Sequence, residues 1–373
     1  MKITFDATNI RSGGGIKHFV NLQNHMKEFD HINFEIYLSD ELSKIKFKHS
    51  SNFKIIYPWW SKYNPFIRTF LHQFFFYYSL KKSNPDFVIY PGSIIPLNCK
   101  NFNSISIAQN MLPFCKKTAG NIFDFKTYLL KFLYISSYKN SKIVLFLTLQ
   151  SKKLVEKFTG PIINSFIIPH AFQSKKKISK RITKYYKKNQ FFKLIYISPI
   201  ISYKNQIKIL DALNILNNRY KNIYSIDFIG VGKGKYFKKF ISKLSKLQNK
   251  GFKLSYRGFI DYDNLIKTIP DYDASIFSSS CETLPFTVLE IHENNIPLLI
   301  SNYSPMKDLF NDDIIKFDPL SPSSISSAMI KLFSLSKYSY ELSNFSLQLS
   351  KMTWKNHLNE IINILNNFEK NNG

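Results

Sequence analysis

Short apolar runs alternate along the chain with longer stretches in which apolar residues recur every three or four positions. The run Lys2–Ala7 predicts a strand, and Ile16–Phe29 predicts an amphipathic helix behind it. A long aromatic helix is expected between Pro65 and Ser83. Further runs of strand length are Phe34–Ser39, Phe53–Pro58, Phe87–Pro91, Ile105–Gln109 and Lys142–Thr148. Alternating strands and helices predict a doubly wound α/β domain with a parallel sheet.

The same alternation restarts after residue 190. The strands expected there are Phe192–Ser198, Tyr224–Gly230, Leu254–Gly258, Asp273–Ser280, Ile296–Ser301 and Ile314–Phe317. Between the halves, in Gln173–Gln190, the hydrophobic pattern stops and basic residues crowd together, which predicts a linker. We therefore expect domains at 1–172 and 191–352, joined by the linker 173–190, and a final helix in 353–373 whose end frays after Asn366.

The stretch from Asp273 to Ser301 reads as strand, loop, helix and strand, and it carries two carboxylates. Glu282 lies in the loop, and Glu290 lies eight residues later in the helix. Ligands of open parallel sheets bind at the carboxyl ends of the strands, where a helix start offers N–H groups and partial positive charge to phosphate. The two Glu would then reach one ligand from neighbouring positions. A solvated helix face with two Glu at this spacing is the alternative.

Other strand exits also carry polar or glycine residues. Gly14 and Gly15 close a glycine-rich turn before the first helix, where backbone N–H groups can approach an anion, although a plain strand-to-helix turn has the same composition. His18, on the first turn of that helix, is a candidate contact to acceptor or phosphate. Gln109 and Asn110 follow a strand and are candidates for hydrogen bonding to a sugar.

These residues resemble the retaining glycosyltransferases of family 4, the glycosyl transferases of group 1. Their mark is a Glu, seven residues, a second Glu and a later Pro, and Glu282, Glu290 and Pro297 match it. The resemblance implies that Glu282 contacts the transferred sugar and that Glu290 holds the ribose of the nucleotide. The segment Tyr203–Gln206 is also similar to the family, whose Lys at the position of Lys204 pairs with the donor diphosphate.

The resemblance implies a GT-B fold, with two Rossmann-like domains facing a central cleft and a C-terminal helix that crosses back to the N-terminal domain. It implies that Glu282 and Lys204 are the catalytic residues. It also implies that the reaction needs no metal or cofactor and uses the nucleotide sugar as its donor substrate. The acceptor side would be His18, Gln109 and Asn110. The donor-binding set would be Gly14, Gly15, Ser198, Lys204, Arg257, Leu284, Pro285, Phe286, Thr287 and Glu290, with Ser198 standing where the family usually has an Arg.

The function implied is transfer of a hexose-type sugar, with retention, from a nucleoside-diphosphate sugar to a lipid-linked glycan. The pathway implied is assembly of a bacterial surface polysaccharide, either lipopolysaccharide O-antigen or capsule. A non-catalytic binding protein on the same scaffold is an alternative, and the residue Ser198 favours it. A basic nucleic-acid-binding protein is a further alternative.

Charge bears on the choice of partner. The 373 residues carry a formal net charge of +27, which points to nucleic acid, an anionic membrane surface or phosphorylated substrates. AT-rich coding would give a similar excess of Lys over Gly without any selected partner. A hydrophobic content of 44% leaves ample material for two cores, so wholesale disorder is excluded.

The stretch Phe123–Tyr138 is an apolar helix with Lys126 and Lys131 among its aromatic residues, and more Lys follow up to Lys157. This mixture suits the interfacial zone of a membrane, and it also suits a packed helix beside a solvated lysine face. Three Cys, far apart in sequence, predict neither a metal site nor a disulfide framework and favour a reducing compartment. We expect a cytoplasmic protein without a signal peptide, peripheral at the inner face of the cell membrane.

Overall fold

The computed structural model describes residues 1–10, 14–44, 50–115, 125–171, 191–216, 223–294, 296–310, 314–336 and 353–372. The chain divides into two compact units. Unit 1 contains Met1–Phe114, Phe123–Gln173 and Lys351–Gly373, and unit 2 contains Cys115–Ile122 and Ser174–Ser350. The predicted linker Gln173–Gln190 lies outside the described residues.

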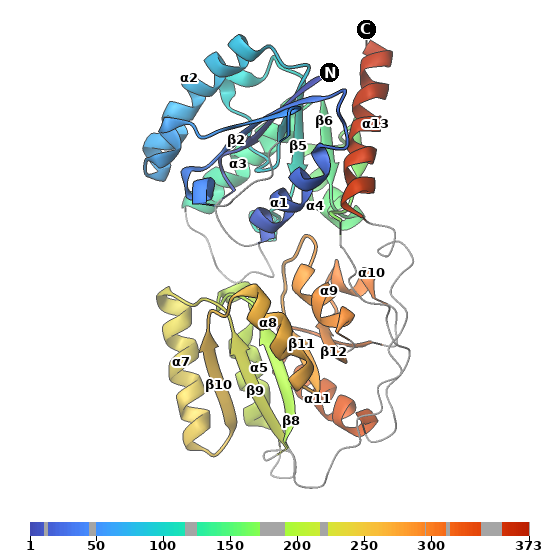
Figure 1. Ribbon diagram of the computed structural model, residues 1–373. Helices are drawn as coiled ribbons and strands as arrows, with labels where there is room; N and C mark the ends of the chain where they lie inside the picture. The colour runs from blue at the N-terminus through green and yellow to red at the C-terminus, as the bar shows by residue number, and fades with distance from the viewer. Residues whose placement is uncertain are drawn as a thin grey trace. The chain divides into compact units, whose positions relative to one another are not determined.

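Unit 1 is built on a parallel sheet in the order β3-β2-β1-β4-β5-β6-β7 (Figure 1). Its strands are β1 Lys2–Ala7, β2 Asn33–Leu38, β3 Phe53–Ile56, β4 Phe87–Tyr90, β5 Ser104–Ala108, β6 Ile143–Phe146 and β7 Ser165–Ile167. The strands β4, β5 and β6 are buried throughout, and β4 and β6 are apolar along their whole length. Continuous burial is expected for parallel strands that helices cover on both faces.

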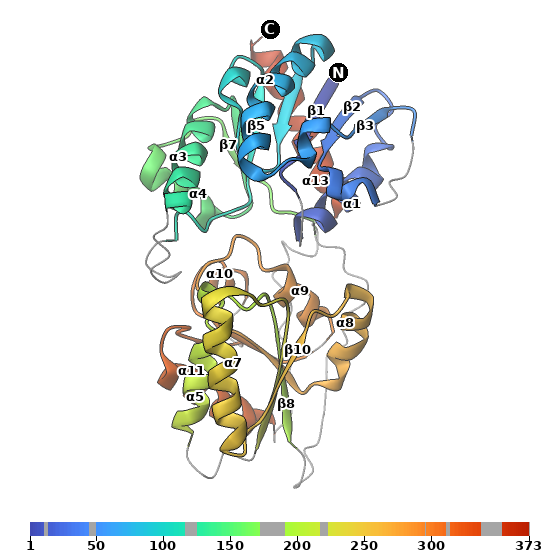
Figure 2. The ribbon, with the colours of Figure 1, turned by 90° about the vertical axis from the view of Figure 1, so that its left-hand side faces the viewer.

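The helices of unit 1 lie on both faces of this sheet. They are α1 Gly14–Met26, α2 Pro65–Ser83, α3 Phe125–Asn140, α4 Leu149–Thr159 and α13 Trp354–Asn372, with the short 3-10 helices η1 Asp40–Lys44, η2 Trp59–Lys62 and η3 Leu97–Cys99. Figure 2 shows α2 in front of the sheet and α13 behind it.

Helix α13 returns to unit 1 from the end of the chain and lies beside α1 (Figure 1). Lys355 Nζ lies 2.9 Å from Glu28 Oε2, and the ring of Phe368 packs against Phe87 at 6.3 Å between centroids. The expectation that the chain frays after Asn366 is wrong, because the helix continues to Asn372 and Phe368 anchors its last turns.

A buried acid and histidine join β1 to α2. His72 Nε2 lies 3.0 Å from Asp6 Oδ2, and the hydroxyl of Thr8 donates to Asp6 Oδ1 at 2.6 Å. Burial alone would raise the pKa of the Asp6 carboxyl, but the charge of His72 and the hydrogen bonds from His72 and Thr8 outweigh it, so the pKa is lowered. The charged form of Asp6 therefore stabilises the folded unit.

We expect Asp6→Asn to lower the free energy of unfolding by about 3 kcal/mol at pH 7, because it removes the buried carboxylate that His72 and Thr8 contact. The pKa of Asp6 is lowered by folding, so its contribution is present above pH 4 and is lost as the pH falls through the folded-state value. The gap between wild type and variant in urea titrations should therefore narrow below pH 4. Asp30→Asn, at a side chain 97% exposed, is the control. A gap that is equal at all pH values would contradict the assignment.

Unit 2 repeats the architecture with a parallel sheet in the order β10-β9-β8-β11-β12-β13. Its strands are β8 Phe192–Ile197, β9 Tyr224–Ile229, β10 Lys253–Gly258, β11 Ala274–Phe277, β12 Leu298–Ser301 and β13 Ile315–Phe317. Its helices are η4 Ser202–Lys204, α5 Gln206–Ile215, α7 Gly234–Asn249, α8 Tyr262–Thr268, η5 Ile269–Asp271, α9 Phe286–Glu293, α10 Met306–Leu309 and α11 Pro322–Ser336. Two doubly wound, Rossmann-like domains confirm the predicted fold class.

Two long helices of unit 2, and the short α10, were not predicted from the sequence. Helix α7 buries Phe240, Leu244 and Leu247 against the sheet, and α11 buries Ile325 and Met329 in the same core. Their apolar residues do have helical spacing. Lysines dominate the rest of α7, and serines fill the first turns of α11, so both segments resemble polar connections in sequence.

The glycines after β9 serve packing. Gly230 has φ +141°, and a Cβ there would lie 2.0 Å from the carbonyl oxygen of Ser198. A Cβ on Gly232 would lie 2.2 Å from the ring of Phe237. Glycine thus lets the end of β9 approach the loop after β8 closely.

Candidate active site

The second sheet reverses its winding between β8 and β11. In doubly wound sheets, ligands bind outside the carboxyl ends of the strands at this reversal. The loop from Ser198 to Asn205 follows β8, and the loop from Ser278 to Pro285 follows β11. Lys204 and Glu282 belong to these two loops, so the topology places both at the point where a ligand is expected.

The structure brings Lys204 and Glu282 together in an ion pair between Lys204 Nζ and Glu282 Oε1. The two side chains are only 11% and 14% exposed. The ammonium group also lies 4.9 Å from the centre of the Phe277 ring and 5.4 Å from that of Tyr203. Aromatic faces and a carboxylate together replace most of the water around this cation.

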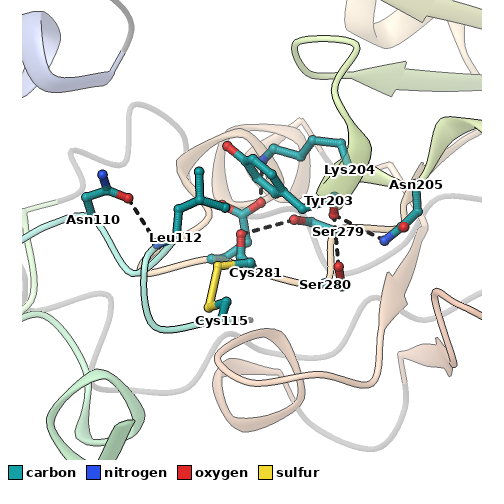
Figure 3. The surroundings of a disulfide bond; sticks show 10 residues. Asn110, Leu112, Cys115, Tyr203, Lys204, Asn205, Ser279, Ser280 and Cys281 are labelled. Carbon is teal, nitrogen blue, oxygen red and sulfur yellow. Dashed lines mark hydrogen bonds and ion pairs between the residues drawn. A yellow bond between two sulfur atoms is a disulfide. The ribbon is translucent and has the colours of Figure 1, made fainter. Parts of the chain in front are cut away.

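Hydrogen bonds to the backbone fix the two loops to each other (Figure 3). The carbonyl of Lys204 accepts from the hydroxyls of Tyr196 and Ser278, the latter at 2.8 Å. The carbonyl of Tyr203 accepts from the N–H of Ser280 at 2.9 Å. Asn205 adopts a left-handed backbone, φ 56°, and donates from Nδ2 to the carbonyl of Ser278 at 2.8 Å. The position of Lys204 is therefore set by its backbone.

Within the segment Tyr203–Gln206, only Lys204 was predicted as a site residue. Tyr203, Asn205, Ser278 and Ser280 were not predicted. The signal was the run of three serines at the end of β11, since small hydroxyl residues there can bond a neighbouring loop. Burial, followed by the negative charge of Glu282, raises the pKa of Tyr203 to about 12, so its hydroxyl stays protonated at neutral pH.

Helix α9 follows Glu282 and carries much of the predicted donor set. Leu284 and Pro285 are buried at its start, Pro285 is its N-cap, and Phe286 and Thr287 form the first turn. Glu290 lies half-buried on the second turn, and its carbonyl accepts from Asn294 Nδ2 at 2.8 Å. His292 packs on the ring of Phe310, and burial lowers its pKa to about 4, so it is neutral in the folded helix at pH 7.

Two predicted donor residues make contacts within the fold. The hydroxyl of Ser198 accepts from Gln206 Nε2 at 2.8 Å and ties the loop after β8 to the start of α5. Arg257 Nε lies 2.6 Å from Asp227 Oδ2, an oxygen that also accepts from the hydroxyl of Tyr272. The Arg257 side chain is more than half exposed. Their roles toward a donor stay predictions.

The predicted acceptor residues and the glycine pair belong to unit 1. Gly14 and Gly15 begin α1, and His18 lies on its first turn. Gln109 and Asn110 follow β5, where Asn110 Oδ1 accepts from the N–H of Leu112 and its Nδ2 donates to the hydroxyl of Tyr134.

The sheet of unit 1 reverses between β1 and β4, and the two exits there touch. A Cβ on Gly92, after β4, would lie 3.1 Å from Cβ of Asn9, after β1. The residues 11–13 of the glycine-rich turn lie outside the described residues.

The structure corrects the expectation about cysteines. Cys115 and Cys281 form a disulfide in unit 2, with 6.1 Å between their Cα atoms (Figure 3). Cys281 immediately precedes Glu282, so the bond holds the backbone beside this carboxylate. Cys99 is buried, and burial raises the pKa of its thiol to about 12. The separation of 166 residues gave no sequence signal for the pairing, and the inference of a reducing compartment loses its basis.

The described part of the chain was compared with the requirements of metal sites and of membrane-spanning helices, and it meets neither. It contains no cluster of three or more His, Cys, Asp or Glu side chains placed to hold a metal ion. It also contains no helix that is both long and apolar enough to span a membrane.

The part of the chain that carries the site is similar to a family of known proteins. The profile of the family described as glycosyl transferases group 1 matches residues 175–347, which include both Lys204 and Glu282. The capsular polysaccharide biosynthesis glycosyltransferase CapH of Staphylococcus aureus is 26% identical over 290 residues, covering 73% of this chain and 76% of CapH.

Solved structures share the fold at low identity. The lipopolysaccharide outer core galactosyltransferase WaaB, in its apo form, aligns with a TM-score of 0.66 and 16% identity over 97% of this chain and 99% of WaaB. Anabaena HepE in complex with UDP and glucose aligns with a TM-score of 0.69 and 11% identity, over 97% of this chain and 99% of HepE. These likenesses agree with the predicted GT-B class.

The ion pair between Lys204 and Glu282 should contribute to the free energy of unfolding. We expect Lys204→Gln to lower the free energy of unfolding by about 2 kcal/mol, because it leaves the Glu282 carboxylate desolvated without its cation. The double variant with Glu282→Gln should recover most of this loss, since neither charge remains. Lys246→Gln, at an exposed position on α7, is the control. Additive losses in a urea double-mutant cycle would show that the two side chains are not coupled.

Proposed function

We propose that this protein is a glycosyltransferase that moves a hexose-type sugar, with retention, from a nucleoside-diphosphate sugar to a glycan. The match of residues 175–347 to the family glycosyl transferases group 1 supports the proposal. The observation that carries the proposal is the pairing of Lys204 with Glu282 at the reversal point of the second sheet. A cation and a carboxylate held together there suit the two halves of such a donor, its diphosphate and its sugar.

The reaction breaks the bond between the anomeric carbon and a diphosphate oxygen, which leaves with the bonding electrons. A hydroxyl oxygen of the acceptor forms the new bond to the anomeric carbon, and its proton passes to the departing diphosphate. Negative charge grows on the leaving oxygens, and Lys204, poorly hydrated and fixed by its backbone, can stabilise that charge without reorganising. The donor diphosphate must compete with Glu282 for the ammonium group. Sugar hydroxyls can then donate to the released carboxylate, so binding of the whole donor satisfies both charges. We propose that no metal or further cofactor takes part.

The remaining donor residues follow α9. Glu290, on its second turn, would accept hydrogen bonds from the ribose hydroxyls. The residues Leu284 to Thr287, at the start of the helix, would face the phosphates. Arg257, with more than half of its side chain exposed at the end of β10, would contact the nucleobase side. In unit 1, Gly14 and Gly15 would approach the phosphates or the acceptor.

We propose that the acceptor is a lipid-linked glycan in bacterial surface polysaccharide synthesis, either capsule or lipopolysaccharide O-antigen. Two similar proteins support this proposal. CapH is a capsular polysaccharide biosynthesis glycosyltransferase, and WaaB, which shares the fold, is a lipopolysaccharide outer core galactosyltransferase. His18, Gln109 and Asn110 would bind this acceptor. The protein would work in the cytoplasm, peripheral to the inner face of the cell membrane.

The second candidate is a non-catalytic binding protein on the same scaffold. The observation in its favour is Ser198, which stands at the place of an expected cation and engages Gln206. Both candidates would bind the nucleotide-sugar donor, but only the glycosyltransferase would turn it over.

A nucleoside diphosphate should stabilise the protein. At a hundred times its dissociation constant, a ligand that binds only the folded state adds about 2.7 kcal/mol. Differential scanning calorimetry with UDP, GDP, ADP, CDP and dTDP should show a rise in Tm with at least one of them. Absence of any shift across this panel would contradict donor binding at the site.

The two carboxylates should separate binding from chemistry. Glu290→Ala should weaken binding of the diphosphate, because it removes the acceptor for the ribose. Glu282→Gln should not weaken that binding, because it frees Lys204 from its competing carboxylate, and it should lower turnover. Titration calorimetry for the diphosphate and product analysis with nucleotide sugars are the measurements. If both variants bind alike and turn over at the wild-type rate, the assignment of this pair is wrong.

A further inference from the structure

Helix α2 of unit 1 is apolar on both of its sides. One side is buried, with Phe76 and Leu80 packed against Val88 and Tyr90 of β4. On the other side, the large side chains Ile67, Phe70, Phe74 and Tyr78 are exposed. Exposed residues three, four and four positions apart form one stripe along a helix, about 16 Å long for this span. A surface helix normally carries polar residues on that side.

The stripe continues beyond the helix. Trp59, from η2, packs edge to face on Phe75 of α2 with 4.8 Å between ring centroids, and half of its surface is exposed. Trp60 beside it is buried and stacks on the same ring at 5.8 Å. The buried ring anchors the pair, so Trp59 is presented at a fixed place next to the helix. Contiguous exposed aromatic surface of this kind marks an interaction site.

The charge along the stripe is mainly positive. The 36 residues from Ser50 to Pro85 contain no Asp or Glu, and their five basic residues are Lys54, Lys62, Arg68, Lys81 and Lys82. Lys62 precedes the helix, lies 4.0 Å from Asp40 Oδ1 and keeps 65% of its side chain exposed. Lys81 and Lys82 lie exposed in the last turn of the helix. An aromatic stripe with basic residues at its ends is the composition of helices that lie in the interface of an anionic bilayer.

We propose that the stripe of α2, together with Trp59 and the lysines that flank it, docks unit 1 on an anionic membrane. The inference rests on the proposed function, since a lipid-linked acceptor is reached at such a surface, and it names where the membrane is met. A second copy of the chain is a poorer occupant, because it would bring two mainly basic surfaces together. Soluble nucleic acid is also poorer, because the cations flank the rings and a single-strand groove places them among the rings.

Helix α3 is the competing surface, and its lysine is already engaged. Tyr128, Leu129 and Phe132 are exposed on it. The ammonium group of Lys131, however, lies 3.2 Å from the centre of the Phe158 ring in α4, and Lys152 lies 3.9 Å from Glu156. Lys131 is therefore covered more closely by an aromatic ring than Lys81 of α2, whose ammonium group lies 5.2 Å from the centre of the Tyr77 ring. The membrane role expected for 123–157 stays a prediction, which the same experiment tests.

The experiment is co-sedimentation of the full chain with vesicles of phosphatidylcholine containing about 30 mol% phosphatidylglycerol. The α2 variant carries Phe70→Ser, Phe74→Ser and Tyr78→Ser, and the matched α3 variant carries Tyr128→Ser, Leu129→Ser and Phe132→Ser. All six positions are exposed, so both variants should fold. We expect the α2 changes to lower the vesicle partition coefficient by about tenfold or more. The α3 changes should leave it within about twofold of the wild-type value.

Two further readouts locate the contact and its charge dependence. Vesicles should shift the tryptophan emission to the blue, and Trp59→Phe should remove most of the shift. Lys62→Gln with Lys81→Gln and Lys82→Gln should weaken binding to the anionic vesicles and leave the weak binding to pure phosphatidylcholine unchanged.

Several results would overturn the proposal. They are vesicle binding that survives the α2 changes, binding lost only in the α3 variant, and self-association or oligonucleotide binding that depends on the stripe while vesicles are ignored. The thermal shift with nucleoside diphosphates is measured on the same variants. A retained shift with lost vesicle binding supports membrane docking, whereas a missing shift in the wild type would contradict the proposed glycosyl transfer and leave the vesicle result to stand by itself.

Discussion

The ion pair between Lys204 and Glu282 is the interaction on which this account of the molecule depends. Two charges are withdrawn from most of the water at the one place where the second sheet reverses its winding. Attraction between such groups barely offsets the cost of removing them from water, so stability alone is a poor reason for the pair. The proposed function explains it as a binding device, in which each charge would bind part of a donor and each satisfies the other until the donor arrives.

The surrounding structure serves to hold that pair in place. Backbone hydrogen bonds join the loop of Tyr203 and Lys204 to the serines after β11, and the disulfide at Cys281 fixes the chain next to Glu282. Gly230 lets a third strand exit pack closely against the same loop. Groups prepared in this way need little rearrangement when charge develops in a reaction. Unit 1 repeats the architecture, with the buried pair of Asp6 and His72 linking its first strand to α2.

The sequence predicted most of the fold, because apolar runs with clear boundaries mark strands and helices. The runs Lys2–Ala7 and Pro65–Ser83 have the bounds of β1 and α2. Helices α7 and α11 were missed where lysines and serines outnumber the buried residues, and α13 proved longer because Phe368 packs on the sheet. Long-range pairing was beyond sequence reasoning: Lys204 and Glu282 were both chosen as candidates, but nothing in the chain said that they touch, and the cysteine pair left no local signal.

Hydrogen–deuterium exchange of the full chain, with and without a stabilising nucleoside diphosphate, tests the central claim most directly. The ligand should slow exchange in the peptides that cover the two strand exits, residues 198–206 and 278–290, where amide groups line the reversal point of the second sheet. Slower exchange confined to other parts of unit 2, or spread evenly over both units without a maximum at these loops, would contradict the claim that the donor binds at Lys204 and Glu282.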